Sequence, residues 1–369
     1  MTFNQEVIKN DEKAIFALRS LYRKYGYKQY KMSKFEEYDL YARNKDFLVS
    51  DSVITFTDFG GKLLALKPDV TLSIIKNSQE GSLTKVYYNE NVYRAAEGSH
   101  SFKEIMQTGL ECIGDIDTYN ICEVIMLAVE SLGAISDDYV MDISHMGLIS
   151  GILTEATEDS ALQKKILKCL GEKNIHELKA ICAQAETDST SLELLASLYG
   201  SGDKVIEALK KLSLSQVAAE SLSELENINN FLKENGLADK VNFDFSIAGN
   251  IKYYSGVIFK GYINGISSGV LSGGQYSKLL HRMGKKTDAI GFAVYLDMLE
   301  RMNTTIRKYD VDTVLLYEEG ADVSALYKNI KLLTDIGTTV LAVKEVPDIK
   351  YKQLLKFNGK GVEILESND

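Results

Sequence analysis

Two polar side chains that could bind a ligand, Gln107 and Glu111, lie four residues apart in a segment with the character of a strand. Successive side chains of a strand point to opposite faces, so these two side chains share a face. The segment also carries Ile105, Leu110 and Ile113, and its polar face is therefore either exposed to solvent or lines a pocket. The spacing alone favours a solvated face.

A third polar residue, Arg94, closes the strand that precedes this segment. The stretch from Val86 to Gly114 begins with a run rich in Val and Tyr, continues through a polar loop with Gly98, and returns to an apolar run from Ile105 to Ile113. This pattern predicts strand, loop, strand. Because the planar guanidinium of arginine binds phosphate in a bidentate manner, Arg94 could contact an anion.

A carboxylate stands at a predicted strand-to-helix junction. We expect a hairpin from Val53 to Leu66, which Pro68 ends, and a helix that starts at Thr71. Asp69 is placed to cap this helix. Taken alone, the position favours a capping residue without a ligand.

Composition excludes several classes of protein. The 369 residues include 42 basic and 52 acidic side chains, and 42 − 52 gives a net charge of −10, which argues against a nucleic-acid-binding surface. We expect no membrane span, no signal peptide, no metal site and no cofactor, because long apolar runs and metal-type Cys or His spacings are missing. The four cysteines favour reduced thiols and a cytoplasmic location.

The order of the remaining elements predicts an α+β chain. Helical periodicity dominates about 147–239, between two halves that are rich in strands, and it shows no polar constellation. In the larger part of the chain the other expected elements are a helix over Asn10 to Tyr25, an extended segment over Tyr27 to Tyr41, a helix over Thr118 to Leu132, a strand over Tyr139 to Ile143, strands within Val241 to Gly274 and a helix within Ile290 to Leu299. A small α/β piece is expected over Asp312 to Asp369. It has strands near 312–319, 338–345 and 361–365 and a helix over Val323 to Ile336.

Several of these segments, in this order, resemble the histidyl branch of the class II aminoacyl-tRNA synthetases. Tyr93-Arg94, Phe102 and Gln107 to Gly114 are similar to the second class II motif. Gly26 to Tyr41 resembles the dimer-forming first motif, although Ser33 replaces its usual proline. The third motif corresponds to Ile290 to Leu299, and the two histidine-specific segments correspond to Ile251 to Phe259 and Ser272 to Leu280.

The resemblance implies a class II synthetase-like core over 1–305, which is an antiparallel sheet flanked by helices with the helical insertion at about 147–239. It also implies a truncated anticodon-binding-like α/β module over 311–369. In that core a histidine pocket is expected, and Leu66-Lys67-Pro68-Asp69-Val70-Thr71 resembles the segment that holds the amino group of histidine. The pocket residues that the resemblance implies are Asp69, Thr71, Arg94, Gln107, Glu111, Tyr253, Tyr254 and Tyr276.

The phosphate-binding residues of the synthetases are mostly replaced. Ala96 stands where the second motif has an acidic residue, and three positions where the family has arginine carry Gly249, Gln275 and Met298; Ser277 also replaces an aspartate. Adenylation requires cations that neutralise the triphosphate in the transition state. The profile therefore predicts a pocket without catalysis.

This combination resembles the regulatory subunits of short-form ATP phosphoribosyltransferase, which acts in the first step of histidine biosynthesis and makes phosphoribosyl-ATP and pyrophosphate from ATP and phosphoribosyl pyrophosphate. The resemblance implies a non-catalytic subunit without catalytic residues, with histidine as ligand and feedback effector. It also implies a self-dimer through the first motif and a hetero-octamer with the catalytic subunit. The sequence does not decide whether the feedback histidine uses this pocket or a subunit interface.

Two other functions stay open at this point. The chain could be a divergent but active histidyl-tRNA synthetase, against which the acidic charge, the short C-terminal module, Gly249 and Met298 count. It could also be a histidine-binding module with another partner. We expect no tRNA partner and no membrane partner.

Overall fold

The computed structural model describes residues 8–48, 52–95, 101–247, 253–301 and 308–368. The chain divides into two compact units, 1–302 and 303–369, which are described separately. Among the described residues, no helix is both long enough and apolar enough to cross a membrane. All four cysteines are buried and free.

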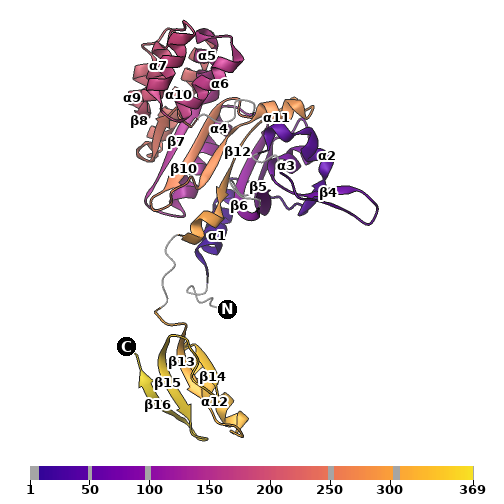
Figure 1. Cartoon of the computed structure of the whole chain (residues 1–369), viewed down its shortest axis with the longest axis vertical. Coiled ribbons are helices and arrows are strands. Elements are labelled where there is room, and N and C mark those ends of the chain that lie inside the picture. Colours follow the sequence, from indigo (N-terminus) through magenta and orange to yellow (C-terminus); the bar gives the residue numbers. More distant parts are fainter. Residues whose placement is uncertain (1–7, 49–51, 96–100, 248–252, 302–307, 369) are drawn as a thin grey trace. The chain divides into compact units, whose positions relative to one another are not determined.

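A nine-stranded sheet forms the centre of the first unit (Figure 1). Its six middle strands are antiparallel, whereas β1 and β9 pair in parallel with β5 and β7, and the edge strand β8 pairs antiparallel with β9. The predicted α+β class with an antiparallel sheet and flanking helices is therefore confirmed. In spatial order the strands are β1 (Lys28–Gln29), β5 (Thr84–Ala95), β6 (Phe102–Gly114), β12 (Asp288–Tyr295), β11 (Leu271–Gln275), β10 (Val257–Ile263), β7 (Tyr139–His145), β9 (Val241–Asp244) and β8 (Tyr199–Gly200).

The two faces of this sheet differ in chemistry. Leu110 and Cys112 of β6 join the main apolar core with α1 (Asn10–Lys24) and α4 (Thr118–Gly133). Because side chains alternate along a strand, the residues between them point to the opposite face, which is left for polar groups. The predicted strand-loop-strand segment thus forms the middle of the fold.

Six helices follow β7 and confirm the helical stretch that was expected between the two strand-rich parts. Figure 1 shows them gathered at the end of the sheet where β7 and β8 lie. The helices are α5 (Met146–Ala156), α6 (Ser160–Gly171), α7 (Ile175–Gln184), α8 (Thr190–Ser197), α9 (Gly202–Leu209) and α10 (Gln216–Glu234), and a 3-10 turn follows at Ala238–Lys240. The last and longest of these helices, α10, packs against the first, α5, so the two ends of the insertion lie side by side.

A smaller sheet, β2-β4-β3, lies beside β5 near the N-terminal end of this unit. The predicted hairpin is confirmed by β3 (Thr55–Thr57) and β4 (Leu63–Leu66), which pair antiparallel. The strand expected over Tyr27 to Tyr41 is wrong beyond β2 (Phe35–Glu37), since α2 (Tyr38–Arg43) and a 3-10 turn (Lys45–Phe47) follow. One turn of helix buries Tyr41 completely while Asp39 and Arg43 pair on its exposed side, which a strand would not allow.

Two helices frame the polar face. The predicted helix after Asp69 is α3 (Thr71–Asn77), and α11 (Ser277–Arg282) follows β11. Both join a second apolar cluster beneath this face, through Ile74, Ile75 and Leu279.

The helix expected within Ile290 to Leu299 is wrong for its first part. Residues 288–295 form strand β12 between β6 and β11, and only Leu296–Arg301 turn into a 3-10 helix. Ala289, Ile290, Phe292 and Val294 are all buried, so both faces of this strand are covered. A strand that is buried on both faces has a continuous apolar run, which periodicity cannot distinguish from a buried helix.

The second unit is a four-stranded sheet in the order β14-β13-β15-β16 with one helix. Leu315, Leu326, Leu355 and Phe357 form its small core. Strand β15 was not predicted, because its residues include three lysine or glutamine side chains, Lys352, Gln353 and Lys356. The elements are β13 (Val311–Leu316), α12 (Val323–Asp335), β14 (Val340–Val343), β15 (Tyr351–Phe357) and β16 (Val362–Ser367).

Candidate functional site

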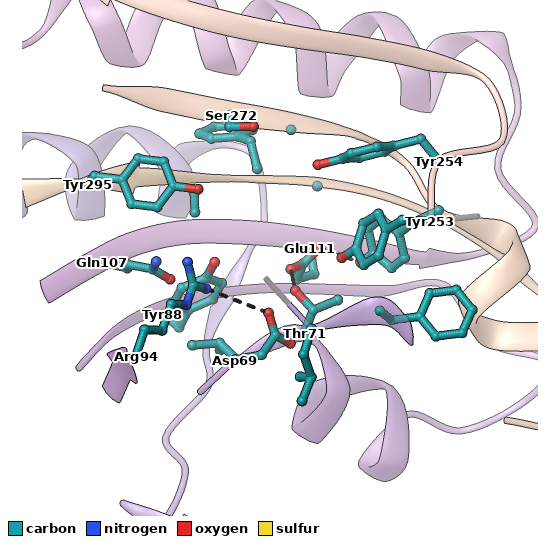
Figure 2. Close-up of a pocket in the computed structure, with 18 residues that line it drawn as sticks. Asp69, Thr71, Tyr88, Arg94, Gln107, Glu111, Tyr253, Tyr254, Ser272 and Tyr295 are labelled. Atoms are coloured by element: carbon teal, nitrogen blue, oxygen red, sulfur yellow. Dashed lines mark hydrogen bonds and ion pairs between the residues drawn. The ribbon is translucent and has the colours of Figure 1, made fainter. Parts of the chain in front are cut away.

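A cavity of about 370 Å³ opens on the polar face of the sheet, and Figure 2 shows the side chains that line it. Strands β5, β6, β11 and β12 supply its floor, and the start of α3 and the segment before β10 supply its sides. All the residues expected in a pocket line this one cavity, namely Asp69, Thr71, Arg94, Gln107, Glu111, Tyr253, Tyr254 and Tyr276. The solvated face that spacing alone favoured for Gln107 and Glu111 is wrong, because each is only 2% exposed.

Glu111 lies at the end of the cavity near Thr71 and Tyr253 (Figure 2), and both of its oxygens accept hydrogen bonds. Thr71 Oγ1 donates a hydrogen bond to Oε1 over 2.7 Å, and the Tyr276 hydroxyl donates one to Oε2. Burial raises the pKa of Glu111 from 4.5 to about 8, although these two hydrogen bonds oppose the shift. The carboxyl group is therefore largely protonated at neutral pH, and a cationic or N–H donor partner would favour its ionised form.

Asp69 has two roles at once. Its Oδ1 accepts the backbone N–H of Leu72 over 2.9 Å, so its carboxylate pairs with the first turn of α3 as expected, although Val70 and not Asp69 occupies the N-cap position. Its Oδ2 lies 4.0 Å from Arg94 Nη2 inside the cavity, the contact drawn as a dashed line in Figure 2. Burial raises the pKa of Asp69, and the Arg94 guanidinium opposes this rise.

Arg94 is fixed by the backbone before it meets any ligand. Its Nε donates to the carbonyl oxygen of Pro68 over 2.8 Å, which ties β5 to the segment that precedes α3. Among the described residues that line the cavity, Arg94 is the one cation. The cavity therefore combines one buried and one half-buried carboxyl group with a single guanidinium among its described lining residues.

Gln107 contributes a free amide to the other end of the cavity. Its Nε2 is buried and, among the described residues, has no hydrogen-bond partner. Figure 2 places Gln107 beside Arg94 and Tyr295. A buried amide without a partner carries a desolvation cost that a bound ligand would remove.

Three tyrosines form one wall. The ring centroids of Tyr253 and Tyr254 are 4.7 Å apart, and those of Tyr253 and Tyr276 are 5.7 Å apart. Burial raises the pKa of all three hydroxyls, so they stay protonated donors at neutral pH. The wall offers flat apolar faces and polar edges to a small ring.

Ten further lining residues were not predicted, among them Phe47, Tyr88, Ser272 and Tyr295, which have large or polar side chains. Tyr88 lies six residues before Arg94 on β5, an even spacing that places both on one strand face. Tyr295 pairs directly with Gln107 across β12 and β6. The pairing of Tyr295 with Gln107 could have identified Tyr295 as a pocket residue. The sequence predicts a helix at Ile290 to Leu299, however, and a helix has no such pairing.

Glycine creates the room next to Glu111. A Cβ atom on Gly291 would lie 1.8 Å from Glu111 Oε2 and 2.5 Å from the backbone oxygen of Leu110. Gly291 is directly opposite Glu111 in the strand register. Glycine at this position therefore allows the carboxyl group to lie flat over β12.

Two residues that stand where the synthetases have arginine, Gln275 and Met298, are engaged outside this cavity. Gln275 Oε1 accepts the backbone N–H of Val257 over 2.7 Å, and Met298 packs against the main apolar core. Neither residue lines the cavity, and Ala96 and Gly249 lie outside the described residues. At Ser277, which stands where the synthetases have an aspartate, the backbone N–H donates a hydrogen bond to Ser255 Oγ within the protein.

Taken together, these groups suit a small ligand with an ammonium group and a second N–H donor. Asp69 and Glu111 can accept from such donors, whereas Arg94 and Gln107 can contact a carboxylate. The described lining residues include one guanidinium. Catalysis at a triphosphate relies on several cations, so this cavity is poorly suited to that reaction.

Comparison with known proteins agrees with this geometry. The family model described as histidyl-tRNA synthetase matches residues 4–299. The chain is 31% identical over 292 residues to an ATP phosphoribosyltransferase regulatory subunit of Caldanaerobacter subterraneus subsp. tengcongensis, which covers 76% of this chain and 75% of that protein.

Two solved structures share the fold. One is described as an ATP phosphoribosyltransferase regulatory subunit/histidyl-tRNA synthetase from Bacillus halodurans, with a TM-score of 0.71, 23% identity and 96% of each chain covered. The other belongs to an ATP phosphoribosyl transferase (HisG:HisZ) complex from Thermotoga maritima, with a TM-score of 0.62, 23% identity, and 78% of this chain and 97% of that chain covered.

Proposed function

Because the chain belongs to the family of ATP phosphoribosyltransferase regulatory subunits, within the wider histidyl-tRNA synthetase family, we propose that it is a non-catalytic subunit that binds histidine. Its partner is the short-form catalytic subunit, which makes phosphoribosyl-ATP and pyrophosphate from ATP and phosphoribosyl pyrophosphate. The observation that carries the proposal is the cavity itself. It gathers every expected histidine-binding residue, yet Arg94 is the one cation among its described lining residues.

The histidine ligand is assigned to the cavity by matching charges. Asp69 and Thr71 face the amino group, Arg94 and Gln107 face the carboxylate, and Glu111 accepts the N–H of the imidazole. The tyrosine wall packs against the ring. A ligand that lacks one of these groups would leave a buried polar atom unpaired, which is the physical basis of selectivity.

The regulatory role follows from linkage. Histidine bound in this cavity can act as a feedback inhibitor of the assembly only if active and inactive states bind it with different affinity. The complex described for the Thermotoga maritima protein supports a hetero-oligomer with the catalytic subunit, and we propose a cytoplasmic hetero-octamer here. In this assembly 1–305 is the synthetase-like core with its insertion at about 147–239, and 311–369 is a truncated anticodon-binding-like module.

A self-dimer through the segment that resembles the first class II motif is part of the proposal. Phe35 of this segment is 45% exposed and packs edge-on against Phe56, which is 39% exposed, with ring centroids 5.5 Å apart. Exposed aromatic pairs of this kind are common at the centre of interfaces. The neighbouring ion pair between Lys62 and Glu37 would form part of a polar rim.

One experiment with two measurements tests the function. The first is ATP–pyrophosphate exchange with histidine, and the second is the activity of a short-form catalytic subunit with and without this chain. We expect no exchange and a clear activation that histidine reverses. Exchange would instead indicate an active histidyl-tRNA synthetase, and the absence of both would leave only a histidine-binding module with another partner.

A further inference from the structure

A second cavity of about 290 Å³ lies where α10 of the helical insertion meets the end of β7 and the turn before β10. It is lined by His145, Glu220, Ser221, Glu224, Ser255 and Gln275, among others, and shares no lining residue with the first cavity. The mechanism proposed above uses none of these side chains.

His145 is the most deeply buried polar group of this cavity, with only 4% of its surface exposed. Its Nδ1 accepts the backbone N–H of Leu148 over 3.3 Å at the start of α5. In the neutral ring the hydrogen is therefore on Nε2, which points toward Glu224 Oε1 at 3.5 Å. Neither of these two buried atoms makes a hydrogen bond within the described residues.

The charges of the cavity are unbalanced. Glu220 and Glu224 are one helical turn apart on α10, a spacing at which like charges repel. Among the described residues, no Lys or Arg lines the cavity, and no ion pair other than the contact with His145 involves either carboxylate. The cavity therefore presents negative charge and hydroxyl groups around a space that a cation could fill.

We propose that this second cavity binds a guanidinium group. A planar guanidinium has five donors and can bridge two carboxylates one turn apart, with the serine hydroxyls and the Gln275 amide at its edges. Glu224 can receive the His145 N–H and the guanidinium at the same time, since a carboxylate has about four acceptor positions. The group would belong either to a small molecule or to an arginine side chain of the catalytic subunit.

Equilibrium dialysis of the full chain with radiolabelled methylguanidinium chloride tests the site. We expect saturable binding of one probe per chain, and replacement of Glu220→Gln together with Glu224→Gln should weaken it about tenfold or more, because charge-assisted hydrogen bonds are lost. The matched control is Glu226→Gln with Glu234→Gln, which removes the same charge from the same helix. This control should change the affinity by less than about twofold, because neither Glu226, which pairs with Lys210, nor Glu234 lines the cavity.

A gain-of-contact variant covers the case in which the double variant folds poorly. Val217→Arg places a guanidinium at the mouth of the cavity, beside Glu220, and should compete with the probe, whereas Val217→Ala should not. Absence of saturable binding would overturn the proposal. So would equal losses in the test and control pairs, or a loss caused instead by Asp69→Asn with Glu111→Gln, which would place the probe in the first cavity.

A second dialysis experiment, with the catalytic subunit added, distinguishes the two possible sources of the guanidinium. Only this second experiment rests on the proposed function. If adding the catalytic subunit displaces the probe, the natural occupant is an arginine of that partner. If the probe still binds in the complex, the natural occupant is a small molecule. Both results support the site, because the binding by the isolated chain has already been established without the partner.

Discussion

The Tyr276 hydroxyl donates a hydrogen bond to Glu111 Oε2, and this contact joins the entrance of α11 to the middle of β6. With Thr71 on the other oxygen, both partners of the carboxyl group are neutral. Burial raises the pKa of Glu111 to about 8, and these two neutral donors oppose the rise only in part. The carboxyl group of the unliganded protein is therefore largely protonated at neutral pH, and a cationic or N–H donor ligand would favour its ionised form.

The raised pKa of Glu111 predicts how stability depends on pH. The folded state holds this proton up to about pH 8, whereas the unfolded chain releases it near 4.5. Stability from this group is therefore fully present below pH 4.5 and is lost as the pH rises toward 8, with a slope of at most about 1.4 kcal/mol per pH unit. Between pH 5.5 and 8 the parent should lose on the order of 2–3 kcal/mol relative to Glu111→Gln in urea unfolding.

The control for this measurement is Glu104→Gln, at an exposed carboxylate of the same strand. This variant should follow the parent across the pH range. If Glu111→Gln shows the same pH profile as the parent, the carboxyl group of Glu111 titrates normally and the proposed environment is wrong.

Loss of the Glu111 carboxyl group should weaken histidine binding. Glu111→Ala removes the acceptor proposed for the imidazole and leaves Thr71 and Tyr276 without their shared partner. We expect the dissociation constant to rise by the equivalent of roughly 1–3 kcal/mol in isothermal titration calorimetry. An unchanged dissociation constant would refute the assignment of Glu111.

Gln107 should separate binding from stability. Its Nε2 is buried without a hydrogen-bond partner among the described residues, so Gln107→Met should change the free energy of unfolding by less than about 1 kcal/mol. The same substitution should weaken histidine binding about tenfold, because the amide has a partner only when the ligand is present. Equal affinity in parent and variant would remove Gln107 from the site.

The sequence predicted the central hairpin and the shared face of Gln107 and Glu111, because a period of two is unambiguous in β6. It could not show that this face is covered, since burial depends on Tyr253 and Tyr276, which are more than 140 residues away in the chain. The local sequence pattern does not indicate that Tyr253 and Tyr276 belong to the pocket. The resemblance to histidyl-tRNA synthetases does.

The errors have the same cause. Both faces of strand β12 are buried, so its apolar run has no diagnostic period and the sequence wrongly predicts a helix there. That error concealed Tyr295, which only the strand register with β6 places opposite Gln107. The helical turn that buries Tyr41 depends on tertiary packing, which overrides the extended pattern of its neighbours.

Gly291 should be intolerant of any side chain. In Gly291→Ala the new Cβ would collide with Glu111 Oε2 and with the backbone of β6, so the carboxyl group must move. We expect a loss of roughly 1–3 kcal/mol in stability, typical of overpacking, together with weaker histidine binding. Gly171→Ala is the control, because the nearest atom to its Cβ is 3.7 Å away. Normal binding in Gly291→Ala would show that the position of Glu111 is not critical.

The exposed aromatic pair predicts the oligomeric state of the isolated chain. Analytical ultracentrifugation should show a dimer for the parent, and Phe35→Ser with Phe56→Ser should raise its dissociation constant about tenfold or more, since central aromatic residues carry much of the binding energy. Leu332→Ser is the control, because it removes an even more exposed apolar side chain, which lies in the second unit. The parent should be monomeric if the proposed interface is wrong. A double variant that stays as tightly dimeric as the parent would place the interface elsewhere, because these rings would then contribute nothing to association.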